Sequence, residues 1–239
     1  MRIDLLRTPA PPNEVAFLRY EARRPRGVTL VAGHGYSSSK HNLDALCAFL
    51  AGHGFTVYSL DFPGHKLGAS GGRLGGVDDC IAAMSAVVGV ARSREQAGPV
   101  YVMGHSMGAM TAIFSAALDP QLAGVIAIAT GYGRPSAIAA MQRAGVADFR
   151  SAYVDGVTLP ELLVDVDARY AQLLPRLAGR PCLYVSAGAD GMVSPASVAE
   201  LYTHAPEPKT LAAIHGDHTY AAEHARGEVL AWLNALHPR

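Results

Sequence analysis

The sequence predicts an α/β protein with a doubly wound, mostly parallel sheet. Short apolar runs alternate with longer segments whose apolar residues recur every three or four positions. These are the patterns of buried strands and of the helices that cover them. The clearest example is the apolar run from Val100 to Met103, which is followed by Met107, Met110, Ile113 and Phe114 at helical spacing. Such alternation favours parallel strands joined by right-handed crossovers.

The expected elements follow that alternation along the chain. An antiparallel edge hairpin is expected first, because residues 8–13 form a turn-rich break between two strand-like segments. The expected strands are 3–7, 15–20, 28–32, 55–60, 100–103, 122–129, 182–186 and 209–214. The expected helices are 43–50, 77–91, 107–118, one that opens at Pro195, and 222–236.

Residues 130–179 depart from this alternation. Helical pieces can be drawn at about 135–143, 149–154 and 159–174, and no strand-like run separates them. We expect a small helical cap inserted at about 131–179 into a single domain that spans 1–239; the alternative is a set of helices packed on the flank of the sheet. Tyr132, Met141 and Tyr153 of this segment, with Met192 of a later loop, are candidates for an apolar substrate pocket, although helix packing would explain them as well.

Composition narrows the class of protein. The chain has 239 residues, and Lys plus Arg equals Asp plus Glu at 20 each, which argues against nucleic acid or an anionic membrane as a partner. No apolar run approaches the length of a membrane span. The three cysteines are far apart and are expected to be core residues in a reducing, cytoplasmic setting. No metal-ligand spacing or phosphate loop is present, so we expect no metal and no cofactor, and nothing indicates the oligomeric state.

The predicted junction between strand and helix at residues 104–108 reads Gly-His-Ser-Met-Gly. This is the G-x-S-x-G pattern of a nucleophile elbow, in which a sharp turn presents the serine hydroxyl to the substrate. Side chains at Gly104 and Gly108 would collide with nearby backbone, which explains the glycines. The bare pattern also arises by chance, so Ser106 needs a base, an acid and an oxyanion donor to support it.

His218 is the expected base, because it lies in the loop after the last strand; His215, three residues earlier, is the alternative. Asp190 is the expected acid, since it follows the preceding strand and completes the order Ser, Asp, His. Asp217 is too near His218 in sequence to reach round its ring, and Asp61 is expected to tie its own loop.

The oxyanion donors are expected to be the backbone N–H groups of Met107, at the helix start, and of Tyr36, after the third strand. His34 is expected to tie the loop before Tyr36 by hydrogen bonds, and His105 to point away from the hydroxyl. Both histidines are further candidates for contact with the substrate.

Five segments together resemble the α/β-hydrolase fold superfamily over essentially the whole chain. They are 34–35, 61–65, 104–108, 190–195 and 216–218. The resemblance implies an eight-stranded sheet, a Ser-His-Asp triad and a cap, and it is nearest in character to small serine esterases and lysophospholipase-like or acyl-aminopeptidase-like hydrolases. One departure is the loop that runs from Gly64 to Ser70, which is longer than the usual Gly-His-Gly-x-Ser.

The residues therefore predict a serine hydrolase that cleaves carboxylic ester or thioester bonds of small apolar acyl or aryl substrates through an acyl-enzyme on Ser106. A serine at this position argues against the dehalogenase and epoxide-hydrolase chemistry that the superfamily performs with a carboxylate. Carbon–carbon bond hydrolysis, cofactor-free perhydrolysis and a non-catalytic ligand-binding role remain alternatives, because the same superfamily includes all three.

Overall fold

The computed structural model describes residues 1–95, 98–143 and 149–238. Within them, eight strands form one sheet in the order β1-β2-β4-β3-β5-β6-β7-β8. The pairs β1–β2 and β2–β4 are antiparallel, and all pairs from β4–β3 to β7–β8 are parallel. The strands are β1 Arg2–Ala10, β2 Asn13–Glu21, β3 Thr29–Gly33, β4 Thr56–Leu60, β5 Val100–His105, β6 Gly124–Ile128, β7 Cys182–Ala187 and β8 Lys209–Ile214. The predicted mostly parallel sheet and its antiparallel edge hairpin are confirmed.

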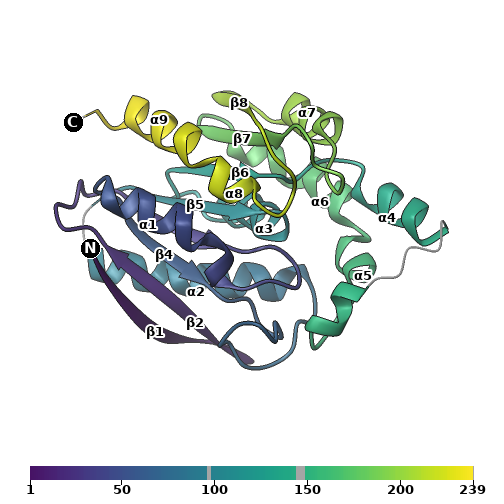
Figure 1. Ribbon diagram of the computed structural model, residues 1–239, viewed down its shortest axis with the longest axis horizontal. Coiled ribbons are helices and arrows are strands. Elements are labelled where there is room, and N and C mark those ends of the chain that lie inside the picture. The colour runs from purple at the N-terminus through teal and green to yellow at the C-terminus, as the bar shows by residue number, and fades with distance from the viewer. Residues whose placement is uncertain (96–97, 144–148, 239) are drawn as a thin grey trace.

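Helices cover both faces of the sheet (Figure 1). One face packs against α2 and α3, and the other packs against α1, α8 and α9. Strand β3 shows why both faces are apolar, because Val31 belongs to one core cluster while Leu30 and Ala32 belong to the other. These helices, with α7 and the short η1, are η1 Lys40–Leu43, α1 Asp44–Gly52, α2 Val77–Glu95, α3 Met107–Leu118, α7 Pro195–His204, α8 Ala221–His224 and α9 Arg226–Leu236.

Among the described residues between β6 and β7, the chain forms five helical pieces. They are α4 Arg134–Arg143, η2 Phe149–Tyr153, α5 Leu159–Leu163, α6 Val166–Leu173 and η3 Leu174–Leu177. In Figure 1, α4 and α5 stand out beyond one end of the sheet, while α6 packs on α3. The segment predicted to be a cap thus has two parts: α6 packs on the flank of the sheet against α3, and α4 and α5 project beyond the end of the sheet.

Two helices that the periodicity predicted as continuous are interrupted. The expected helix 159–174 ends at Leu163, and α6 begins at Val166 after Val164, which is 72% exposed. Leu162 and Tyr170, on either side of the interruption, are both buried. Likewise the closing helix is divided at Ala225, and Leu236, expected to face the core, is 39% exposed.

The long loop after β4 has a structural partner. The Asp155 N–H donates to Gly64 O at 2.8 Å, the Leu74 N–H donates to Asp155 O at 2.8 Å, and the Lys66 N–H donates to Tyr153 O at 3.0 Å. Its extra residues therefore pair with the chain that leads from η2 into α5. The loop that departs from the usual pattern holds one side of the inserted segment in place.

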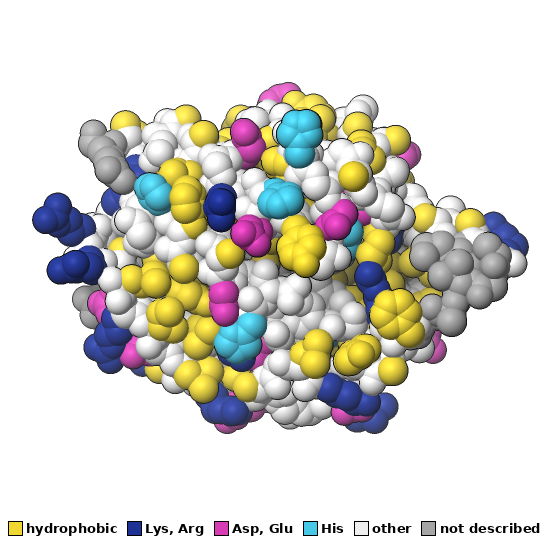
Figure 2. Space-filling view, viewed as in Figure 1, with side chains coloured by type: hydrophobic (Ala, Val, Ile, Leu, Met, Phe, Trp, Pro, Cys, Tyr) yellow, Lys and Arg dark blue, Asp and Glu magenta, His cyan; other side chains and the backbone are white. Residues whose placement is uncertain are grey.

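The surface carries charges of both signs, and Figure 2 shows acidic and basic side chains interspersed on one face. No helix within the described ranges is long and apolar enough to cross a membrane. The three cysteines, Cys47, Cys80 and Cys182, are buried and free.

Candidate active site

Ser106 lies at the turn between β5 and α3. Its φ of 55° and ψ of −114° place a non-glycine residue in a strained region, as expected at a nucleophile elbow. A Cβ on Gly104 would lie 2.1 Å from the carbonyl carbon of Gly108, and one on Gly108 would lie 2.0 Å from Gly33 O. The structure therefore confirms the predicted crowding. Because the two glycines have no side chain, β3, β5 and α3 can approach one another closely behind the serine.

Three side chains that follow different strands meet at this turn. The Nε2 atom of His218 lies 3.0 Å from Ser106 Oγ, and Asp190 Oδ2 lies 2.7 Å from His218 Nδ1. The carboxylate accepts the Nδ1 proton, which leaves the Nε2 lone pair directed at the serine hydroxyl. The structure brings the predicted Ser106, Asp190 and His218 together with the geometry of a nucleophile, a base and an orienting acid.

The alternatives for these roles lie elsewhere. His215 is exposed, and its carbonyl accepts a hydrogen bond from His224. Asp217 accepts from the Tyr220 N–H at 3.1 Å and does not contact the ring of His218. Asp61 is paired with the Lys40 ammonium at 2.5 Å, so it ties its loop as predicted.

Asp190 is held as a carboxylate. Burial alone would raise its pKa, but the His218 hydrogen bond and the N–H groups of Val193 and Met192 outweigh burial, so its pKa lies below the usual value. Both backbone N–H groups donate to Oδ1, at 2.8 Å from Met192 and 2.7 Å from Val193. Oδ2 is thereby left for His218.

Two buried histidines support the site from behind. His105 Nε2 donates to the His218 carbonyl at 2.8 Å, and the two rings pack 4.7 Å apart. His34 donates from Nδ1 to Gly35 O at 2.7 Å and accepts at Nε2 from the Phe62 N–H at 3.0 Å. Burial lowers the pKa of each ring to about 3, so both are neutral.

The two backbone segments that carry the predicted oxyanion donors, Tyr36 and Met107, lie close to Ser106. Met107 begins α3, and its N–H lies in the first turn, where amides have no partner within the helix. A Cβ on Gly35 would lie 3.4 Å from Ser106 Cβ, so the Gly35–Tyr36 backbone passes beside the nucleophile. Tyr36 and Met107 both line the cavity into which Ser106 opens.

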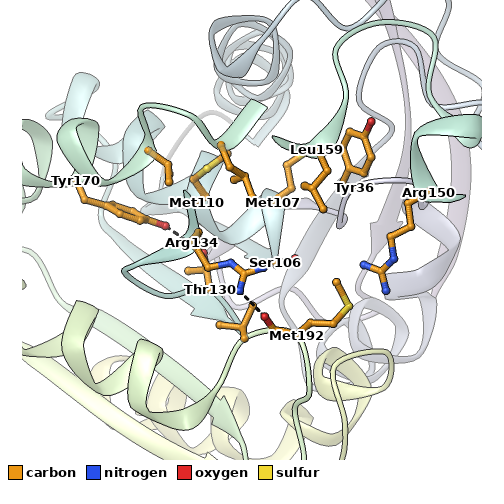
Figure 3. Close-up of a pocket in the computed structure, with 13 residues that line it drawn as sticks. Tyr36, Ser106, Met107, Met110, Thr130, Arg134, Arg150, Leu159, Tyr170 and Met192 are labelled. Atoms are coloured by element: carbon orange, nitrogen blue, oxygen red, sulfur yellow. Dashed lines mark hydrogen bonds between the residues drawn. The ribbon is translucent and has the colours of Figure 1, made fainter. Parts of the chain in front are cut away.

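The space between the side chains that line this cavity is about 420 Å³ when the open solvent at its mouth is counted, so the cavity is narrow and partly open. Apolar side chains from α3, α5 and α6 make up much of its wall, as Figure 3 shows. Two arginines, Arg134 of α4 and Arg150 of η2, also reach it. The lining residues are Tyr36, Ser106, Met107, Met110, Thr130, Arg134, Arg150, Leu159, Leu163, Val166, Tyr170, Met192 and Val193.

Of the residues predicted to contact the substrate, Met192 lies on the cavity wall. His34 and His105 are held behind it by the hydrogen bonds given above. Tyr132 packs on Tyr170 with ring centroids 6.1 Å apart and donates to Asp167 O, so it supports the wall without lining it.

The remaining predicted pocket residues are Tyr153 and Met141. Tyr153 is 44% exposed and is absent from the lining; it contributes its carbonyl to the pairing with Lys66. The side chain of Met141 lies outside the described part of the structure.

The two arginines of the cavity wall, Arg134 and Arg150, were not predicted, because charged residues on helices usually face solvent. The only indication in the sequence was that Arg134 follows closely on the end of a central strand.

A mostly parallel sheet that carries a serine, an aspartate and a histidine beyond the ends of three of its strands, here β5, β7 and β8, is typical of the α/β-hydrolase class. Within that class, the chain belongs to the family Hydrolase_4, described as serine aminopeptidase, S33, whose model matches residues 23–172. The resemblance stated from the sequence is thereby confirmed. No curated protein matches the sequence.

Solved structures with the same fold include several hydrolases. Est1E from Butyrivibrio proteoclasticus, solved with ferulic acid, is 18% identical over 97% of each chain, with a TM-score of 0.76. The Pyrococcus furiosus esterase Pf2001 is 20% identical over 98% of this chain and 90% of that chain, with a TM-score of 0.71. A Paleococcus ferrophilus monoacylglycerol lipase is 18% identical over 97% of this chain and 99% of that chain, with a TM-score of 0.70.

Proposed function

We propose that the protein is a serine hydrolase that cleaves carboxylic esters or thioesters through an acyl-enzyme on Ser106. The observation that carries this proposal is the hydrogen-bonded series from Ser106 to His218 to Asp190, at 3.0 and 2.7 Å, at the base of the cavity. Membership of a hydrolase family supports it, as do structural neighbours that are named esterases and lipases.

The chemistry follows from the positions of these atoms. His218 Nε2 removes the proton from Ser106 as Oγ attacks the carbonyl, and Asp190 stabilises the imidazolium that results. The N–H groups of Tyr36 and Met107 hold the developing oxyanion. His218 then protonates the leaving alcohol or thiol, and a water molecule activated in the same way releases the acid from Ser106.

The cavity wall favours an ester over an aminopeptidase substrate, despite the family description. An aminopeptidase needs an anionic group to bind the α-ammonium of its substrate. The thirteen described lining residues include no Asp or Glu, and their charged members are Arg134 and Arg150. A cationic wall repels a free amino terminus.

Hydrolysis of short nitrophenyl esters by wild type and Ser106→Ala tests the proposal. We expect the variant to lose activity while circular dichroism and the unfolding temperature stay unchanged. A matched nitroanilide should be hydrolysed far more slowly than the ester. Unchanged ester turnover in Ser106→Ala would refute the proposal, and a preference for the anilide of a free amino acid would favour the aminopeptidase instead.

A further inference from the structure

Arg134 is a buried cation in the wall of the cavity that holds Ser106. It is the first residue of α4 and is 8% exposed. Its Nη1 donates to the carbonyl of Met192, in the loop that also carries Asp190. Figure 3 shows the guanidinium extending from α4 toward Ser106, with this hydrogen bond dashed.

Most N–H groups of the Arg134 guanidinium have no hydrogen-bond acceptor among the described residues. Of its five N–H groups, one has an acceptor among the described residues, and no carboxylate there lies within ion-pair distance of it. The nearby acids are engaged elsewhere: Asp167 accepts from the Gly133 N–H at 3.1 Å, and Asp190 is fully used by His218 and its own loop. Burial lowers the pKa of Arg134, and the more distant negative charges of Asp190 and Asp167 offset this only in part.

Arg150 adds a second positive charge to the same wall. It enters the cavity from η2, on the side away from Arg134 (Figure 3). Its positive charge lowers the pKa of both Arg134 and His105, although burial is the larger cause for each. An apolar ester would leave Arg134 buried without an anion, which is an expensive arrangement.

We propose that the natural substrate of this site is an ester or thioester that carries a second, non-reacting carboxylate, which pairs with the guanidinium of Arg134. This inference rests on the proposed hydrolase function and narrows its substrate class. A carboxylate accepts two parallel N–H bonds from a guanidinium, so it would fix the substrate's orientation as well as supply affinity. Arg150 adds attraction at longer range.

Two pairs of esters locate the carboxylate on either side of the scissile bond. Monoethyl adipate against ethyl hexanoate places it on the acyl side, and 4-acetoxybenzoate against 4-methylphenyl acetate places it on the leaving group. The measurement is the ratio of kcat/KM for the charged ester to that for the neutral ester, in wild type, Arg134→Gln and Arg134→Lys. Differences in intrinsic reactivity within a pair cancel when variants are compared.

We expect the charged-to-neutral ratio to fall about tenfold or more in Arg134→Gln for at least one pair, mainly through KM, since hydrogen bonds between charged groups are strong. Arg134→Lys should keep part of the ratio. Arg143→Gln is the matched control, because Arg143 is exposed at the other end of α4. It makes the same charge change and should leave both pairs unaffected.

A binding measurement separates this inference from the hydrolase proposal. Calorimetric titration of Ser106→Ala protein with adipate and with 4-hydroxybenzoate needs no turnover, and at least one should bind and lose affinity about tenfold with Arg134→Gln added. Equal losses for charged and neutral esters in Arg134→Gln would mean that Arg134 only holds the Met192 loop. That result would overturn the inference. So would an equal fall of the charged-to-neutral ratio in Arg143→Gln, or ligand affinity that does not change when Arg134→Gln is added.

Discussion

Replacing Asp190 by Asn is expected to reverse the tautomer of His218. In the wild-type protein, Asp190 Oδ1 accepts two backbone N–H groups, from Met192 and Val193, and Oδ2 accepts the Nδ1 proton of His218. An asparagine has one oxygen and one NH₂. The two backbone N–H groups keep their hydrogen bonds to the asparagine oxygen, so its NH₂ faces His218 Nδ1. The ring proton then moves to Nε2, which can no longer accept the proton of the Ser106 hydroxyl.

The size of the loss follows from those two backbone hydrogen bonds. Restoring the active tautomer requires the amide to flip, which sets its NH₂ against two N–H donors. At about 1–3 kcal/mol for each unmade bond, the active tautomer lies about 2–6 kcal/mol higher. Adding the lost stabilisation of the imidazolium, we expect kcat for a nitrophenyl ester to fall about 1,000-fold or more.

Asp217→Asn is the matched control, because Asp217 is an exposed acid next to His218 in sequence and makes no contact with its ring. It should keep wild-type kinetics. Both variants should have native circular dichroism, so that a loss in Asp190→Asn is chemical. Retention of more than about one-tenth of wild-type kcat in Asp190→Asn would refute the tautomer argument.

Two predictions concern stability. Gly108→Ala should lower the free energy of unfolding by at least about 3 kcal/mol or prevent folding, because its Cβ would lie 2.0 Å from Gly33 O. Gly89→Ala in α2, where the new Cβ meets open space, should instead stabilise the protein by about 0.5–1 kcal/mol. Urea titrations compare the two variants, and equal effects would contradict the crowding argument. His34 and His105 have pKa values of about 3 in the folded protein, so below pH about 6.5 the unfolded chain binds more protons than the folded protein. The free energy of unfolding should therefore fall by about 2 kcal/mol for each histidine between pH 7 and pH 5. A free energy of unfolding that does not change over this pH range would show that the rings are not held neutral.

Much of the site was predictable because its residues follow strands that appear in the sequence as short apolar runs. Ser106, Asp190 and His218 each lie within four residues of the end of an apolar run, and parallel strands bring their carboxyl ends to one edge. The glycines at 104 and 108 were predictable for the same reason, since close backbone approach leaves no room for Cβ. Eight strand-like segments were visible in the sequence, and the family resemblance implied the same number.

The cavity wall was less predictable. Apolar spacing runs without interruption through 159–174, so the break near Val164 leaves no trace in the pattern. Aromatic residues such as Tyr132 look alike whether they line a pocket or pack behind it. The orientation of Arg134 depends on where α4 begins relative to the Met192 loop, which is a long-range property that local periodicity does not encode.

Labelling by a fluorophosphonate probe tests the central claim most directly, because only a serine activated by a neighbouring base reacts readily. Peptide mapping by mass spectrometry should find one adduct, on Ser106, and ester hydrolysis should fall in proportion to labelling. Ser106→Ala should not react. An adduct on another residue with full loss of activity, or undiminished hydrolysis by fully labelled protein, would contradict the assignment of Ser106 as the nucleophile.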